Sequence, residues 1–158
     1  IDHYRKKYNK PKYPPAWATM ELISFGQLSK VYAGLKSCRA KQEIAMTYGI
    51  RDEVLESWMH YFNYLRNCCA HHLRIWNRVF RVAPKRPKRP TPISLPQNVP
   101  QNRIFYGITC LQYLMIIIGK PDFLPKSLDP IINEYQPSFY PMGFPKGQNW
   151  KEFDVWKG

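Results

Sequence analysis

Three side chains near the middle of the chain, Arg66, Asn67 and His71, are of the types that can cleave RNA without a metal ion. In that reaction the RNA 2′-hydroxyl attacks the adjacent phosphorus, so the protein supplies no nucleophile but must move protons and stabilise charge. A histidine can move the proton near neutral pH, and an arginine can neutralise the non-bridging oxygens. We predict that His71 is the general acid/base, that Arg66 is the charge stabiliser, and that Asn67 orients His71 or the phosphate.

The stretch that positions these residues, 52–81, is predicted to be one long helix. Asp52 suits an N-cap, and neither Gly nor Pro follows until Pro84. At about 100° per residue, one face is apolar and the opposite face is polar, without any carboxylate. The apolar face comprises Leu55, Trp58, Phe62, Leu65, Cys69, Leu73, Trp76, Val79 and Phe80, and the polar face comprises His60, Asn63, Asn67, His71, Arg74 and Arg78.

Amides, imidazoles and guanidiniums of this kind bind phosphate, and His72, Arg74 and Arg78 are therefore candidates for positioning RNA. One straight helix does not direct Arg66 and His71 to the same point, because five residues turn through about 140° beyond a full turn. Asn67 and His71, spaced i,i+4, do meet. An Arg and a His at this spacing are also common as merely structural or solvent-facing residues.

A longer string of residues gives a family resemblance. Arg66-Asn67-Cys68-Cys69-Ala70-His71 resembles the R-x-x-x-x-H signature of the HEPN superfamily. The flanking blocks resemble the Abi-like (AbiD/AbiF type) abortive-infection family of bacteria: Trp58-Met59-His60, Ala70-His71-His72, residues 73–78 (LRIWNR), residues 20–29 (MELISFGQLS), and residues 140–145 (YPMGFP) with Asn149-Trp150.

The resemblance implies an all-α, HEPN-like helical bundle with a long central helix. It also implies a metal-independent endoribonuclease in phage defence, with a composite site at the interface of a homodimer that would bring Arg66 and His71 together. The whole chain resembles the later half of the family, so we expect it to be the C-terminal portion of a longer protein.

The charge of the chain favours a polyanionic partner. Lys and Arg number 24 and Asp and Glu 11, which gives a formal net charge of +13 over 158 residues. RNA, DNA and anionic membrane all attract such a domain, and a merely soluble basic protein is the alternative. Aromatic residues near the basic ones suit stacking on unpaired bases. No apolar run reaches about 18 residues, so we expect no membrane span. The charge and the family resemblance together lead us to expect RNA, and no membrane, as the partner.

The four cysteines, Cys38, Cys68, Cys69 and Cys110, do not suggest a disulfide framework, because Cys68 and Cys69 would point in different directions on a helix. A reducing cytoplasm is the simpler expectation, with Cys69 buried as a small hydrophobe. Cys68 and His72 could begin a metal site, but no second ligand pair has zinc spacing. We therefore expect no metal and no other cofactor.

We predict one helical domain over 1–158, with helices in 1–81, a connector at 82–100, and further helices and a tail packed on the bundle in 101–158. Six prolines exclude a helix or central strand from the connector. Its Lys85 and Arg86 either contact phosphates or belong to a stiff basic spacer. The remaining expected helices cover about 16–36, 37–48, 102–118 and 124–135, and the aromatic tail, 136–158, covers the bundle. Trp17, Trp58 and Trp76 are expected in the core.

Two functions of other classes remain open. A non-catalytic RNA-binding module would keep the basic face and the dimer without depending on His71. A protein-interaction module, such as the antitoxin-like or regulatory half of a toxin–antitoxin or defence system, would use its charge on a guide-like RNA or on an acidic partner. Such a partner would be an antitoxin-like protein or the missing N-terminal portion of the same chain.

Overall fold

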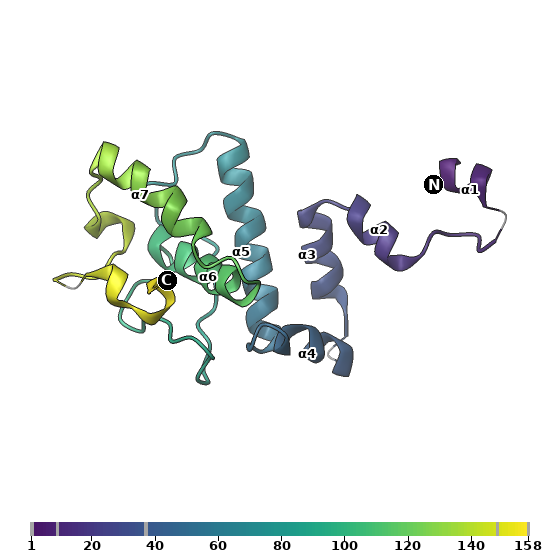
Figure 1. The fold of residues 1–158 in the computed structure, drawn as a ribbon, viewed down its shortest axis with the longest axis horizontal. Helices are drawn as coiled ribbons and strands as arrows, with labels where there is room; N and C mark the ends of the chain where they lie inside the picture. The colour runs from purple at the N-terminus through teal and green to yellow at the C-terminus, as the bar shows by residue number, and fades with distance from the viewer. Residues whose placement is uncertain (1, 9, 37, 148, 158) are drawn as a thin grey trace.

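The computed structural model describes residues 2–8, 10–36, 38–147 and 149–157. All regular elements in these ranges are helical and none is a strand, which confirms the predicted all-α class (Figure 1). The elements are α1 (Asp2–Lys7), α2 (Ala16–Leu22), α3 (Phe25–Gly34), α4 (Arg39–Met46), α5 (Asp52–Ala70), α6 (Ile104–Ile117), α7 (Phe123–Tyr135) and the 3-10 turns η1 (Tyr140–Met142), η2 (Trp150–Glu152) and η3 (Asp154–Trp156).

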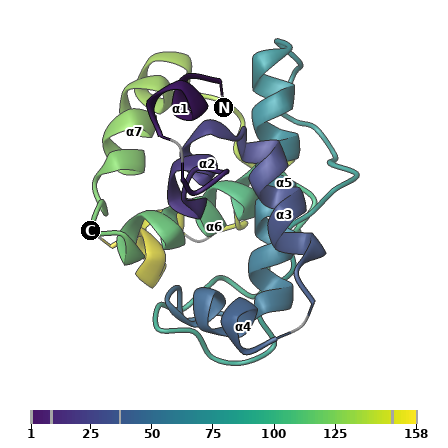
Figure 2. The ribbon, with the colours of Figure 1, turned by 90° about the vertical axis from the view of Figure 1, so that its right-hand side faces the viewer.

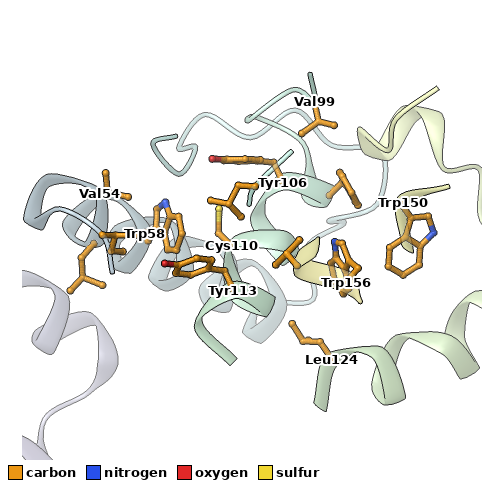
Figure 3. Packing of buried hydrophobic residues seen from close by; sticks show 14 of the residues in the cluster. Val54, Trp58, Val99, Tyr106, Cys110, Tyr113, Leu124, Trp150 and Trp156 are labelled. Atoms are coloured by element: carbon orange, nitrogen blue, oxygen red, sulfur yellow. The ribbon is translucent and has the colours of Figure 1, made fainter. Parts of the chain in front are cut away.

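The core lies where α5 meets α6. Trp58 of α5 is fully buried, and its ring meets Tyr113 of α6 edge to face with ring centroids 5.5 Å apart (Figure 3). The predicted helix at 102–118 is confirmed as α6, and Gly119 follows it with a φ of +74°. Because α6 is apolar nearly all round, it is covered on more than one side.

The tail covers the far side of α6, as predicted. Trp150 and Trp156 are buried, and their rings meet edge to face with centroids 4.9 Å apart (Figure 3). The ring of Phe144 packs against Trp150 with centroids 5.5 Å apart. The Trp156 indole nitrogen donates a hydrogen bond to the Thr109 hydroxyl at 3.3 Å. Buried indoles need such a partner, so the tail is fixed in place by polar as well as apolar contacts.

The proline-rich connector contains no helix, as predicted, but it is packed rather than free. Leu95 and Val99 are buried in the main core cluster. The Lys85 carbonyl accepts a hydrogen bond from the Trp58 indole at 2.8 Å. The two ends of the connector are also bonded to each other, because the Phe80 N–H donates to the Asn102 carbonyl at 2.9 Å.

The prediction that one helix spans 52–81 was wrong, because α5 ends at Ala70. His72 has a φ of +53°, the Leu73 N–H donates to the Cys68 carbonyl at 2.8 Å, and the His72 N–H donates to the Cys69 carbonyl at 3.0 Å. This pair of bonds around a left-handed residue is the Schellman ending of a helix. A glycine normally occupies that position. Because position 72 is a histidine, the sequence did not indicate that the helix ends there.

The predicted apolar face was also displaced. Beyond Ala70 the chain no longer follows the helical wheel, so Leu73, Trp76 and Val79 are exposed. Within α5 the buried stripe includes Tyr61 and Cys68, and Cys69 is exposed rather than buried. All four cysteines are free. The predicted burial of Trp76 was therefore wrong.

The helix expected at about 16–36 is two helices. Ser24 caps α3: its hydroxyl accepts the Gln27 N–H at 3.2 Å, and the Gln27 side chain accepts the Ser24 N–H at 2.8 Å. This capping box starts a new helix and separates α2 from it. Trp17, which lies on α2, is 67% exposed, so its predicted burial was wrong. Of the three tryptophans expected in the core, only Trp58 is buried.

Replacing His72 by glycine is expected to raise the free energy of unfolding by about 1 kcal/mol, because glycine adopts the left-handed conformation without the side-chain penalty. Denaturant unfolding followed by circular dichroism measures the change. His71→Gly is the matched control: His71 has a φ of −96°, so glycine there gains nothing. Equal shifts in the two variants would contradict the role given to the His72 backbone.

Candidate nucleic-acid interface

A polar pocket lies where the first turns of α3 face the last third of α5, two helices that lie side by side (Figure 2). It has a volume of about 410 Å³. Arg66 and Asn67 line it, together with Lys30 of α3. The remaining lining residues are Ser24, Phe25, Gly26, Gln27 and Asn63. The pocket therefore holds two cations and no carboxylate.

Gly26 allows this close approach of the two helices. A Cβ atom at position 26 would lie 2.9 Å from Oδ1 of Asn63. The amide of Asn63 thus lies directly over the first turn of α3. A larger residue at position 26 would displace that amide and reshape the pocket.

Asn67 accepts hydrogen bonds from both of the other predicted catalytic residues, Arg66 and His71. Its side-chain oxygen accepts a hydrogen bond from Nη1 of Arg66 at 3.2 Å, and its backbone carbonyl accepts the His71 N–H at 3.0 Å. The first bond orients the exposed Arg66 guanidinium. That group keeps other N–H donors for a ligand.

His71 and His72 lie at the C-terminal end of α5, and both are exposed. Neither lines the pocket that contains Arg66 and Asn67. The structure therefore brings two of the three predicted catalytic residues into one pocket and leaves His71 beyond it. This placement agrees with the angular separation expected from the sequence.

The part of the chain that contains α3, α5 and the Arg66–His71 string is similar to a known protein family. Residues 1–77 match the model of the Abi-like proteins. This segment, which is just under half of the chain, is similar to the Abi-like protein family. The match links the chain to abortive infection, a form of phage defence, and it includes the whole Arg66–His71 string. No curated protein and no solved structure matched the chain.

Two further candidates for RNA binding, Arg74 and Arg78, lie on either side of the end of the Abi-like segment at residue 77. Arg78 is half-buried: Nη2 donates to the Tyr64 hydroxyl at 3.1 Å, Nη1 donates to the Arg74 carbonyl at 3.4 Å, and the guanidinium lies 5.9 Å from the Phe80 ring centroid. These contacts fix the chain after α5. The Arg74 side chain is exposed and is the freer of the two for binding a phosphate.

Beyond the Abi-like segment, Arg86 is held by contacts within the chain, whereas the Lys85 side chain is exposed. The Arg86 guanidinium donates to the Val99 carbonyl at 2.8 Å and lies 4.9 Å from the centroid of the Tyr106 ring. Burial raises the pKa of Tyr106, and the positive charge of Arg86 opposes that rise. Arg86 thus stabilises the connector. The exposed Lys85 lines a second pocket of about 340 Å³, which also contains Lys30, His60 and the carboxylates Glu53 and Glu56.

Lys30 belongs to both pockets and joins them along the boundary of α3 and α5. Lys30 was not predicted from the sequence, because no local spacing links it to Arg66 on another helix. Only the packing of α3 against α5 brings Lys30 near Arg66. In the described ranges no group of three His, Cys, Asp or Glu residues could hold a metal ion, and no helix is long and apolar enough to cross a membrane.

Proposed function

We propose that the chain is an endoribonuclease of an abortive-infection system, which cleaves RNA without a metal ion at a site completed by a second copy of the chain. The observation that supports this most directly is the pocket between α3 and α5, in which Arg66, Asn67 and Lys30 converge without a carboxylate. A phosphate in such a pocket would meet a planar guanidinium and an ammonium. The net charge of +13 would draw RNA to it.

In the proposed reaction the 2′-hydroxyl attacks the adjacent phosphorus, and an imidazole nitrogen of His71 accepts the hydroxyl proton. The bond from phosphorus to the 5′-oxygen breaks, and the 5′-oxygen is protonated as it leaves. The products are a 2′,3′-cyclic phosphate and a 5′-hydroxyl. Arg66 stabilises the charge on the non-bridging oxygens as it develops, which is where a fixed donor has its largest effect.

His71 lies outside the pocket that contains Arg66 of the same chain, which is why we include a second copy. In a homodimer, His71 of one copy would act on a phosphate bound by Arg66 of the other. The exposed position of His71, next to the helix end at Ala70, leaves it accessible to such a partner.

The test uses purified chain, labelled single-stranded RNA, and EDTA in the buffer. We expect cleavage that leaves 2′,3′-cyclic phosphate ends, reduced about 100-fold or more in His71→Ala, because general acid–base catalysis supplies about 10²–10⁴ in rate. Asn133→Ala, on exposed α7, is a control that should cleave normally. Circular dichroism and sedimentation check that each variant keeps its fold and oligomeric state.

A non-catalytic RNA-binding module is the second candidate, because a single copy does not place His71 in the pocket. It predicts RNA that is bound but never cut, and equal binding by wild type and His71→Ala. Affinity should fall steeply with salt in either case. Bound RNA that remains uncut would contradict the ribonuclease proposal and favour the non-catalytic RNA-binding module.

A further inference from the structure

The N-terminal arm, defined here as α1, α2 and the described residues between them, is poorly covered. Neither helix contains a buried residue, and both extend away from the other helices (Figure 1). The arm nevertheless has large apolar side chains. Trp17 is 67% exposed and Leu22 is 80% exposed, and Tyr8, Tyr13 and Met20 are exposed as well.

An apolar groove lies beside the root of the arm. It has a volume of about 590 Å³ and runs across α3, α4, α5 and the end of α6. Val31 and Leu35 of α3, Ile44 of α4 and Met59 of α5 line it, and Met20 of the arm lies at its edge. An uncovered apolar groove of this kind marks a site where another chain segment packs.

The accessible surface of the chain is larger than its mass predicts. A folded monomer of 18.8 kDa is expected to expose about 8,300 Å², and this chain exposes 10833 Å². The difference is about 2,500 Å², whereas a stable interface of standard size buries only about 800 Å² on each partner. The arm and the groove together thus offer ample area for a dimer.

The occupant of the groove is best explained as the arm of a second copy. Only Ile23 and Ser24 join α2 to α3, and both have extended backbones. In this arrangement α2 leaves α3 on the side away from the other helices (Figure 1), and Met20 is the arm residue that lines the groove of its own chain. Each copy thus presents an uncovered arm and an uncovered groove that are not paired with each other.

We propose that two copies of the chain exchange arms, with each arm lying in the groove of the other and Trp17 as its anchor. A reciprocal exchange of this kind is closed by a two-fold axis, and a tryptophan at its centre suits an interface hot spot. The inference rests on the second copy in the proposed function and deepens it by naming the surfaces that join the two copies, while its test does not depend on whether RNA is cut. Phe25 lines both the groove and the Arg66 pocket, so a seated arm would reach the edge of that pocket.

Charge gives the exchange a distinctive salt dependence. Each copy has a net charge of +13, and the arm itself contains Arg5, Lys6, Lys7, Lys10 and Lys12. Raising the salt from about 0.1 M to about 1 M shortens the screening length from about 10 Å to about 3 Å. Dimerisation should therefore strengthen with salt, whereas RNA binding should weaken.

Sedimentation of the full chain at both salt concentrations tests the proposal. The arm variant, Trp17→Ser with Leu22→Ser, and the groove variant, Val31→Glu, change exposed positions only, so the fold should persist. Each should weaken the dimer at least about 30-fold, which corresponds to the loss of an interface hot spot. The control, Phe123→Ser with Ile131→Ser on α7, also removes two large exposed apolar side chains and should dimerise like wild type.

Mixing the arm variant with the groove variant gives the sharpest result. One intact arm then meets one intact groove, so the mixture should associate more tightly than either variant alone. Monomers at both salt concentrations, wild-type affinity in the arm variant, or a mixture no tighter than its components would each overturn the exchange. RNA cleavage by the same samples is scored separately, so failure of the ribonuclease proposal is distinguishable from failure of this one.

Discussion

Arg66→Ala is expected to slow RNA cleavage by about 100- to 1,000-fold, the usual loss when one donor to a developing negative charge is removed. The Arg66 guanidinium is exposed and is oriented by the Asn67 side chain, so its removal should leave the fold unchanged. Initial cleavage rates at saturating RNA give the effect on the chemical step. Binding is measured separately by titration.

Arg66→Lys separates charge from shape. Lysine keeps the positive charge but lacks the planar fork of donors, so it should restore RNA binding more than it restores the cleavage rate. Arg89→Ala, an exposed arginine of the connector, removes the same charge and controls for the weaker attraction of RNA. Equal losses in Arg66→Ala and Arg89→Ala would mean that Arg66 contributes only bulk charge.

Gly107→Ala is expected to lower the free energy of unfolding by about 3 kcal/mol, at the upper end of what overpacking costs. Gly107 lies in α6, and a Cβ atom there would overlap the hydroxyl and the ring of Tyr61. Tyr61 is fully buried and packs edge to face against Phe62 and Phe80, so it cannot move aside. Urea unfolding measures the loss.

Gly34→Ala is the matched control for Gly107→Ala. A Cβ atom at Gly34 meets nothing within 4 Å, so alanine there should stabilise α3 by about 0.5–1 kcal/mol through helix propensity alone. Opposite signs in the two variants would support the close contact of α5 and α6 at Gly107. A small loss in Gly107→Ala would show that the two helices can separate at low cost.

Local patterns predicted the start of α5 to within one residue and most of α6, because apolar periodicity depends on neighbouring residues. The N-cap of α5 is Arg51 rather than the predicted Asp52, and it makes no side-chain cap bond. They failed at the end of α5. His72 takes the left-handed conformation that glycine usually occupies, and no local feature distinguishes it from a helical histidine. The displaced stripe, with Cys68 buried in place of Cys69, has a related cause: which face of a helix is buried depends on its partners.

The candidate site was predictable only in part for the same reason. Arg66, Asn67 and Asn63 share a helix. The helical wheel therefore placed the two amides on one face and Arg66 at the boundary between the polar and apolar faces. Lys30 and Gly26 come from a helix far earlier in the chain, and only tertiary packing places them opposite Arg66. Arg86 looked available in the sequence, yet its guanidinium faces the connector's own backbone.

The bonded ends of the connector make it a closed loop. The Phe80 N–H reaches the Asn102 carbonyl, and the Arg103 guanidinium reaches the Asn77 side chain at 3.3 Å. Since the ends are held together independently of what lies between them, the exposed span from Lys88 to Pro90 can change in length without moving α5 relative to α6. Doubling a flexible loop costs only about 0.6 kcal/mol. This exposed basic tip is thus the part of the molecule where insertions, and with them new contacts to RNA, can arise at least expense to the fold.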